Sequence, residues 1–250
     1  MTPASERPAI TPETLRQLAF DQSIRWTSQN DDLWQLIDND LWQLTRNPSL
    51  VLSTVPEQKL QALLQRAECH RLVEGIVEAQ QARLERPTWF ASQGHGDRSY
   101  SEQLARVAYF SMEYMLSEAL PIYSGGLGNV AGDQLKAAND LGVPITAVGM
   151  LWQHGYFRQS IGPDGRQQAL YPVNDTRQMP IEPLLDASGT ALRFAIQLPG
   201  VQIWLRGWQA RVGRHRLLLL DTNDPANPPI ARLITSELYG GDNEMRLRQE

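Results

Sequence analysis

Residues 106–149 decide the fold, and they read RVAYFSMEYMLSEALPIYSGGLGNVAGDQLKAANDLGVPITAVG. The two ends of this segment, 106–111 and 144–149, are short and almost continuously apolar, as buried parallel strands are. Between them, the apolar spacing of residues 129–141 predicts an amphipathic helix, which Gly142 ends as its C′ residue. A strand, a helix and a second strand in this order predict an α/β fold with a parallel sheet.

The residues before this segment are predicted to be helical. Acidic, capping and proline residues mark helix starts, and apolar residues recur with the helical period. The expected helices are one that follows the N-cap Thr11, one from Asp31 to the break at Asn47-Pro48, and one long helix from Pro56 to about Arg86.

The residues after this segment have the pattern of antiparallel strands. Gly162-Pro-Asp-Gly165 is a strong turn signal and predicts a hairpin. Alternating apolar and polar residues predict three further strands, at 192–198, 201–212 and 214–220. Residues 243–250 have the pattern of the first turns of another helix.

These patterns divide the chain into four parts. We expect a disordered lead-in at 1–10, a helical N-terminal extension at 11–91, a linker at 92–99 and an α/β domain at 100–250. Only two parallel strands are recognised, whereas a doubly wound sheet needs more strands to cover both faces. The α/β domain is therefore expected to be incomplete.

Composition narrows the classes of function. The chain has 250 residues, 23 of them Lys or Arg and 28 Asp or Glu, for a formal net charge of −5. This balance disfavours a nucleic-acid or membrane-surface partner, since both require basic patches. No apolar run approaches the ~20 residues of a membrane span, and residues 1–13 lack the apolar stretch of a secretory signal. The lone Cys69 excludes an internal disulfide and a cysteine-based zinc site. A cytoplasmic protein without a metal is the expectation.

Three tryptophans stand out in the helical part, namely Trp26, Trp34 and Trp42. Large aromatic side chains dominate protein cores, so we predict that these three pack a helical core. The alternative is that they stack on sugar rings.

The motif that carries chemistry is the glycine loop Ser124-Gly-Gly-Leu-Gly-Asn129, which directly precedes the predicted helix. Glycines let the backbone approach a ligand closely and turn N–H groups outward, and a helix N-terminus adds partial positive charge. Gly125, Gly126, Leu127 and Gly128 therefore predict a phosphate-binding site. The alternative is a tight glycine turn without a ligand.

Two nucleotide motifs fail on the same residues. Gly126-Leu-Gly-Asn-Val-Ala131 formally matches the dinucleotide fingerprint, but a dozen residues separate it from the preceding strand, and the acidic residue expected about 20 positions later is missing. A Walker loop would need a Lys-Ser/Thr pair, which is also absent.

Three side chains near the ends of the two predicted strands could join this site. Glu113 could bind sugar hydroxyls or orient the glycine loop, and it could equally be an ordinary acid at a helix start. His154 and Tyr156 follow the second strand and would reach the same edge of the sheet, where open α/β sheets place their ligands. A lone histidine is more often structural than catalytic, and no nucleophile–base pair or metal cluster emerges, so no catalytic residue is assigned.

Four ordered motifs resemble those of the α-glucan phosphorylases, in the bacterial and archaeal branch with a helical N-terminal extension. They begin at Ala108 (AYFSMEY), Ser124 (SGGLGN), Gly149 (GMLWQHGYFRQ) and Asn243 (NEMRLRQE). The resemblance implies a glycosyltransferase of the GT-B type, with two Rossmann-like domains. It implies glucosyl transfer between an α-1,4-glucan end and inorganic phosphate, giving glucose 1-phosphate.

The resemblance also implies site residues and a cofactor. The backbone N–H groups of Gly126 and Leu127 would face the substrate phosphate and glucosyl unit, with Glu113 and Tyr114 lining the same sugar site. The cofactor would be pyridoxal phosphate, held by a lysine far downstream in the family. Lys59 and Lys136 are the only lysines here, and neither lies in that sequence context.

The chain thus resembles the N-terminal portion of a phosphorylase that lacks the cofactor domain, and we expect it to be inactive alone. Family members are often homodimers. Two alternatives stay open. Glycogen and starch synthases share a similar loop, but they carry a lysine before it where this chain has Tyr123-Ser124. A non-catalytic glucan-binding fragment could use the aromatic residues of 152–157.

Overall fold

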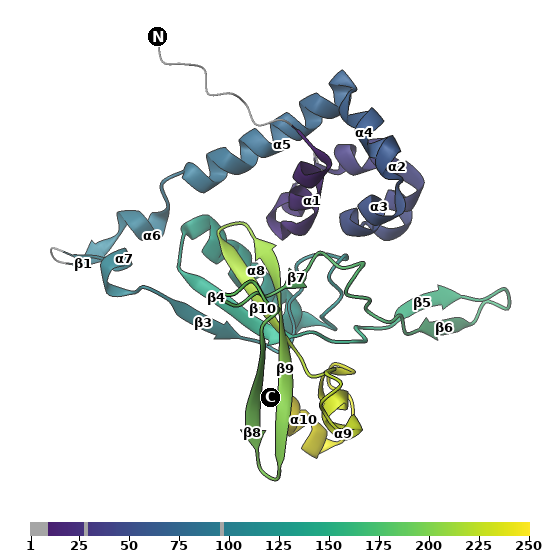
Figure 1. Ribbon diagram of the computed structural model, residues 1–250, viewed down its shortest axis with the longest axis vertical. Coiled ribbons are helices and arrows are strands. Elements are labelled where there is room, and N and C mark those ends of the chain that lie inside the picture. The colour runs from purple at the N-terminus through teal and green to yellow at the C-terminus, as the bar shows by residue number, and fades with distance from the viewer. Residues whose placement is uncertain (1–9, 28–29, 96–97) are drawn as a thin grey trace.

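The computed structural model describes residues 10–27, 30–95 and 98–250 (Figure 1). A group of helices, a mixed sheet covered by one long helix, and a short C-terminal helical segment follow one another along the chain. The predicted lead-in 1–10 lies outside the described residues except for Ile10, which packs against the helical core. No helix of the described part is long and apolar enough to cross a membrane.

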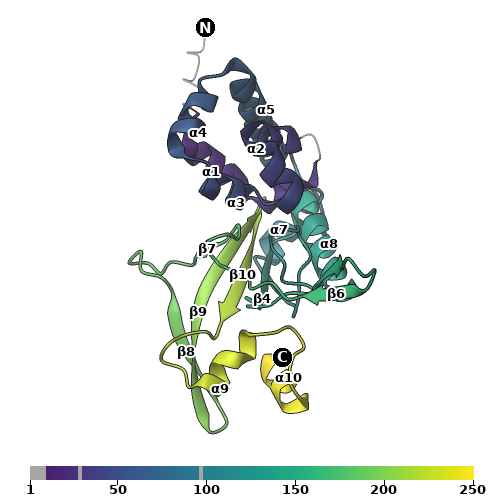
Figure 2. The same ribbon diagram turned by 90° about the vertical axis from the view of Figure 1, so that its right-hand side faces the viewer.

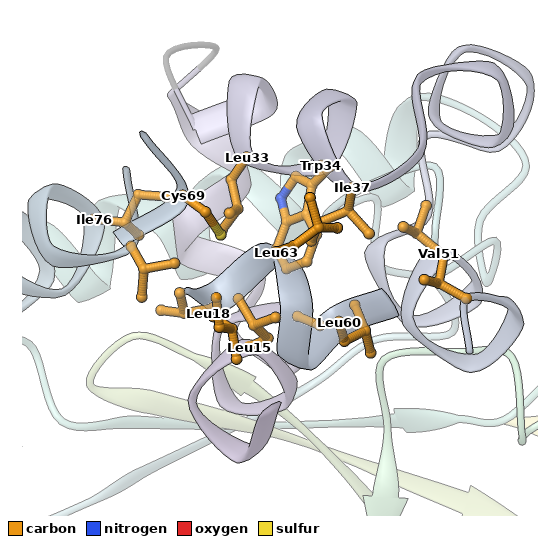
Figure 3. Packing of buried hydrophobic residues seen from close by; sticks show 14 of the residues in the cluster. Leu15, Leu18, Leu33, Trp34, Ile37, Val51, Leu60, Leu63, Cys69 and Ile76 are labelled. Atoms are coloured by element: carbon orange, nitrogen blue, oxygen red, sulfur yellow. The ribbon is translucent and has the colours of Figure 1, made fainter. Parts of the chain in front are cut away.

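The helical unit, residues 10–85, has its own apolar core. Its elements are α1 (Pro12–Phe20), η1 (Gln22–Trp26), α2 (Asp31–Thr45), α3 (Pro48–Thr54), α4 (Glu57–Leu64) and α5 (Ala67–Glu85). Thr11 caps α1 as predicted, because its hydroxyl accepts the N–H of Thr14 in a capping box. Figure 3 shows side chains from α1 to α5 converging on this core.

Two of the three tryptophans confirm the core prediction. Trp34 and Trp42 are fully buried, and their stacked rings lie 6.3 Å apart between centroids. Trp26 is partly buried and packs against the core of the sheet. Trp34 and Trp42 therefore have no face free to stack on a sugar.

The prediction of one long helix over 56–86 is wrong. The chain breaks between α4 and α5, where Arg66 has extended backbone angles. No proline or glycine marks this break; it lets Leu60, Leu63 and Leu64 of α4 and Cys69 of α5 face the same core. The sequence also failed to predict α3, which Asn47 caps by accepting the N–H of Leu50.

The sheet is mixed. Its main path is β3 (Val107–Phe110), β4 (Ile145–Met150), β10 (His215–Asp221), β9 (Val201–Val212) and β7 (Glu182–Pro183), and β8 (Arg193–Leu198) also pairs with β9. β3, β4 and β10 are parallel neighbours, whereas β9 runs antiparallel to β10, β8 and β7. The α/β prediction and the three antiparallel strand stretches are confirmed. The expectation of only two parallel strands is wrong, because β10 pairs with β4.

Helix α8 (Gly126–Leu141) covers one face of this sheet. Its Ala131 and Leu135 share a core with Ala147 of β4 and with Leu217 and Leu219 of β10. Gly142 ends the helix in the left-handed region at φ 74°, as predicted. The prediction that residues 106–111 form a buried strand is wrong as to burial: β3 pairs only with β4 among the described strands, and Phe110 is 71% exposed.

The remaining elements are short. β5 (Arg158–Ile161) and β6 (Gln167–Leu170) form the predicted hairpin, which projects away from the sheet in Figure 1. The predicted linker 92–99 contains the end of α6 (Trp89–Ser92) and two paired strands, β1 (Gly94–His95) and β2 (Arg98–Ser99), and α7 (Tyr100–Gln103) follows it. The chain continues through α9 (Pro229–Arg232) and η3 (Leu233–Thr235) to α10 (Asn243–Gln249), which confirms the predicted C-terminal helix.

The helical unit sits on the sheet where β9 turns into β10 (Figure 2). Asp21, which is 1% exposed, accepts the N–H of Gly213 at 3.0 Å and the side-chain amide of Gln80 at 2.6 Å. On the other side of the turn, Asn139 of α8 accepts the N–H of Arg214 at 2.8 Å. One tight turn therefore joins the helical unit, the sheet and α8.

Candidate functional site

The glycine loop forms the start of α8 itself. Gly125 is the N-cap residue, and residues 126–128 make the first helical turn. The predicted helix start at Asn129 is therefore wrong by three residues, because glycines lower helix propensity and hide the start of the helix. A Cβ atom added to Gly125 or Gly126 would meet nothing within 4 Å, so the protein's own packing does not require glycine at either position.

The carboxylate of Glu113 is hydrogen-bonded to the glycine loop. The Glu113 side chain is 2% exposed. Its Oε2 accepts the backbone N–H groups of Ser124 at 2.6 Å and Gly125 at 3.1 Å, and its Oε1 accepts the hydroxyl of Tyr239 at 2.8 Å. Of the roles considered for Glu113, orienting the glycine loop is the one that its contacts display.

Gly128 and Gly132 bring α8 against the chain that follows β3. A Cβ on Gly128 would lie 2.8 Å from Cβ of Tyr123 and 2.9 Å from Oε2 of Glu113. A Cβ on Gly132 would lie 2.1 Å from the carbonyl oxygen of Met115, whose own N–H donates to the carbonyl of Gly128 at 2.9 Å. These two glycines are needed for close approach, in contrast to Gly125 and Gly126.

The N–H groups of the first helical turn indicate that this loop binds a ligand. Among the residues that the structure describes, no acceptor bonds to the N–H of Gly126 or Leu127. Gly126 is exposed, and Leu127 is 66% exposed. Free N–H groups at the N-terminus of a 16-residue helix favour an anion, and phosphate is the common one.

Tyr114 lies behind this loop, within the core. It is fully buried, and its hydroxyl donates to the carbonyl of Tyr109 at 2.7 Å. Burial raises the pKa of the Tyr114 phenol well above its usual range, so it stays protonated. Its ring packs edge to face on Tyr109 of β3, with centroids 6.0 Å apart, and shows no surface to a ligand in this chain, so its sugar-lining role stays a prediction.

His154 and Tyr156 lie on the chain that leaves β4. His154 is partly buried, and among the described residues its Nδ1 has no hydrogen-bond partner. Its backbone N–H donates to the carbonyl of Ser236 at 2.9 Å. Tyr156 is 54% exposed at the base of the β5–β6 hairpin and packs on Phe157. Within the described part of the chain, neither side chain forms a hydrogen bond or ring contact with the glycine loop, so their sugar-site roles also stay predictions.

The two lysines do not fit a pyridoxal phosphate site at the glycine loop. Lys59 is exposed on α4, with its Nζ 4.0 Å from a carboxylate oxygen of Asp38. Lys136 lies on α8 beside Asp133, and its Nζ sits 5.9 Å from the ring centroid of Trp26. Neither amine reaches the N-terminus of α8, so neither lysine of this chain could attach the cofactor there.

A separate groove lies at the carboxyl ends of β3 and β4. It has a volume of about 700 Å³, and its lining includes Phe110, Met150, Leu198, Ile203 and Leu247. None of the predicted site residues lines it. Its lining is mostly apolar, with Glu244 and Arg248 among its polar members, and it contains no residue of the glycine loop, so the groove and the loop are different features.

Tyr239 is the site residue that the sequence did not reveal. It reaches Glu113 from 126 positions away, and no local pattern links the two. The pair Gly240-Gly241 that follows it signals a turn, which is the only local sign that the backbone at Tyr239 is unusual.

We expect Glu113→Gln to lower the free energy of unfolding by about 1.5 kcal/mol, because two backbone N–H groups lose a charged acceptor. Urea denaturation of both proteins would measure the difference. Glu118→Gln is the control, since Glu118 is exposed on the same segment and its change should stay within about 0.5 kcal/mol. Equal stabilities for Glu113→Gln and the parent chain would contradict the loop-holding role.

Comparisons with known proteins find relatives that align with nearly the whole chain. Residues 11–120 match a family described as a protein of unknown function, DUF3417. The chain is 36% identical over 239 residues to the maltodextrin phosphorylase of Thermococcus litoralis and 39% identical over 238 residues to the glycogen phosphorylase of Mycobacterium tuberculosis. These alignments cover 95% and 94% of the chain but 28% of each relative. A glycogen phosphorylase of Aquifex aeolicus is 40% identical over 144 residues, which are 58% of this chain and 21% of that protein. The chain thus spans little more than a quarter of the length of the first two relatives.

Proposed function

We propose that the glycine loop binds the phosphate group of the substrate in a glucosyl-transfer reaction. The premise is that this chain is related over nearly its whole length to the N-terminal portion of the α-glucan phosphorylases. The reaction would move a glucosyl unit between the end of an α-1,4-glucan and inorganic phosphate, with glucose 1-phosphate as the phosphorylated sugar. The observation that carries this proposal is that, in the described part of the chain, the N–H groups of the exposed residues Gly126 and Leu127 have no acceptor.

Each part of the site would have a separate task. Gly126 and Leu127 would donate N–H groups to phosphate or glucosyl oxygens, with the positive end of α8 behind them. Glu113 would hold the loop in place through its bonds to Ser124 and Gly125. Gly128 would keep the helix start close to that carboxylate.

The fold fits this role in its coarse features. A parallel β3–α8–β4 unit within a mixed sheet is what a Rossmann-like domain of a GT-B glycosyltransferase would contain. The helical unit, residues 10–85, would be the N-terminal extension of the branch that the sequence resembles. Catalysis would need pyridoxal phosphate, which this chain has no lysine placed to hold, so we expect no turnover from it alone. The homodimer implied by the resemblance stays a prediction.

Replacing Gly126 by alanine tests the proposal. The new methyl group meets nothing in the protein, so the variant should fold with unchanged or slightly higher stability. The same methyl group would stand where an anion approaches the two N–H groups. We therefore expect glucose 1-phosphate to shift the amide NMR signals of Gly126 and Leu127 in the parent chain, with binding at least about tenfold weaker in the variant.

Gly75→Ala provides the matched control, because Gly75 lies on α5 with open space around it and far from the loop in sequence. Glucose 1-phosphate should bind this variant as it binds the parent chain. Equal binding by Gly126→Ala, or no shift at Gly126 and Leu127 in the parent, would contradict the proposed site.

One observation favours a second candidate, a glucan-binding surface without catalysis. Tyr156 and Tyr171 are 54% and 62% exposed and flank Phe157, with ring centroids 4.6 and 6.1 Å from it. Such a row of rings could stack on glucose units. Retention of the chain in a glycogen-containing gel, lost in Tyr156→Ala but kept in Gly126→Ala, would favour this candidate.

A further inference from the structure

We propose that Tyr239 is a positioning residue for the glycine loop, whose hydroxyl fixes the Glu113 carboxylate and thereby the direction of the N–H groups at the start of α8. This inference rests on the proposed function for its purpose, although its physical content can be tested without that function. Among the described residues, the Tyr239 hydroxyl bonds to Glu113 and not to the loop itself, so we expect it to act through Glu113.

Tyr239 and the glycine loop bind different oxygens of the Glu113 carboxylate, so together they fix its orientation. Oε2 of Glu113 already accepts two backbone N–H groups, from Ser124 and Gly125. Oε1 has one partner among the described residues, the hydroxyl of Tyr239 at 2.8 Å. Because Glu113 is 2% exposed, Oε1 has little access to water as a substitute partner. Without the Tyr239 hydroxyl, only Oε2 would keep its hydrogen-bond partners, and the carboxylate plane would be free to rotate about them.

The hydroxyl is a donor that remains in place at any physiological pH. Burial, together with the bond to the Glu113 carboxylate, raises the pKa of Tyr239 to about 12. A deprotonated Tyr239 would place a second negative charge against Glu113, and the raised pKa keeps that state unpopulated. The Tyr239–Glu113 bond is therefore a constant part of the site.

The backbone of Tyr239 is held in a conformation that tyrosine disfavours. Its φ is +59°, and within the described residues Arg46 is the one other non-glycine residue with a positive φ. Strain of this kind persists only where neighbouring structure imposes it. Here Arg246 of α10 donates its Nε–H to the carbonyl of Tyr239 at 3.2 Å, and the N–H of Gly240 bonds to the carbonyl of Glu237 at 3.1 Å. The strained backbone thus belongs to the residue whose hydroxyl reaches Glu113.

A tyrosine that merely fills space would differ from a positioning residue in a measurable way. The test is Tyr239→Phe, which keeps the ring and removes the hydroxyl. Hydrogen exchange followed by NMR on the whole 250-residue chain reports each backbone amide separately. We expect the amides of Ser124 and Gly125 to exchange about tenfold faster in the variant, while the protected amides of β10 keep their rates.

Tyr109→Phe is the matched control. Tyr109 and Tyr239 are both partly buried against the same core, but the described residues supply no hydrogen-bond partner for the Tyr109 hydroxyl. Its loss should leave exchange at Ser124 and Gly125 unchanged. Unchanged exchange at these two amides in Tyr239→Phe, or equal acceleration there and in β10, would overturn the positioning role.

A second measurement covers the case in which Tyr239→Phe fails to fold. In the unsubstituted chain, the hydroxyl proton of Tyr239 should exchange slowly enough to be observed by NMR, because it is held by a buried carboxylate. Absence of this signal under conditions that show other buried hydroxyl protons would also overturn the proposal.

The same samples separate this inference from the proposed function. Glucose 1-phosphate should bind Tyr239→Phe about three- to tenfold more weakly than the parent chain. Faster loop exchange without any glucose 1-phosphate binding in either protein would uphold the positioning role and refute the proposed function. Binding to the parent with unchanged loop exchange in the variant would do the reverse.

Discussion

Replacing Gly132 by alanine is expected to lower the free energy of unfolding by about 3 kcal/mol, which is at the upper end of overpacking effects. The added Cβ would lie 2.1 Å from the carbonyl oxygen of Met115 and 2.9 Å from its carbonyl carbon. Both atoms belong to the backbone, so no flexible side chain can move aside. Helix α8 would have to shift away from this segment, and the glycine loop at its start would move with it.

Chemical denaturation of Gly132→Ala beside the control Gly75→Ala would measure this effect. Both glycines lie inside helices, so the gain in helix propensity is the same at the two positions. Gly75 has open space around it, and its replacement should raise stability by about 0.5–1 kcal/mol. Similar stabilities for the two variants would show that the contact between α8 and Met115 is not close.

Trp152→Ala is expected to cost about 3–5 kcal/mol, the range for a fully buried large aromatic side chain. Trp152 is 0% exposed, and its indole N–H donates to the carbonyl of Met112 at 2.8 Å. The substitution therefore opens a cavity and also leaves the carbonyl of Met112, the residue that precedes Glu113, without its indole partner.

Thermal unfolding followed by circular dichroism would test this expectation. Tyr156→Ala is the control, because Tyr156 is 54% exposed on the same stretch of chain and should cost less than about 1 kcal/mol. If Trp152→Ala left the melting temperature within the error of the control, Trp152 would not be the core residue that its burial indicates.

Much of the fold follows from local pattern. The strands β3 and β4 and the end of α8 at Gly142 are confirmed, because each depends on residues that are close in sequence. Thr11 as a cap and the β5–β6 hairpin are confirmed for the same reason. Such features need only a few neighbouring side chains to be specified.

Two of the features that the sequence did not predict depend on distant contacts, and a third is hidden by local composition. The break between α4 and α5 has no local signal and serves the packing of both helices on one core. β10 joins β4 across a long stretch of intervening chain, and its parallel pairing cannot be read from an alternating apolar pattern. The helix start at Gly126 is hidden because three glycines stand where a helix former would be expected.

The candidate site also combines residues that the sequence indicated with one that it did not. Its glycines and the acid at position 113 were predictable, since the loop motif and the end of a strand are local features. The partner of Glu113 on its other oxygen was not, because Tyr239 approaches from a different part of the chain. Sequence spacing could suggest that the loop binds an anion, but it could not show how the loop is held.

The turn at Gly213 has a consequence for how the helical unit is oriented. Gly213 is at φ 60°, and any side chain there would collide with Asn139, whose Oδ1 would lie 2.3 Å from the added Cβ. The N–H groups of Gly213 and Arg214 point to acceptors on opposite sides, one from the helical unit and one from α8. Directional bonds of this kind add modest net stability, but they are satisfied in a single geometry. This turn therefore provides specificity of docking more than strength. The helical unit has one register on the sheet, and a slip of one residue would break the bond between the N–H of Gly213 and the buried carboxylate of Asp21.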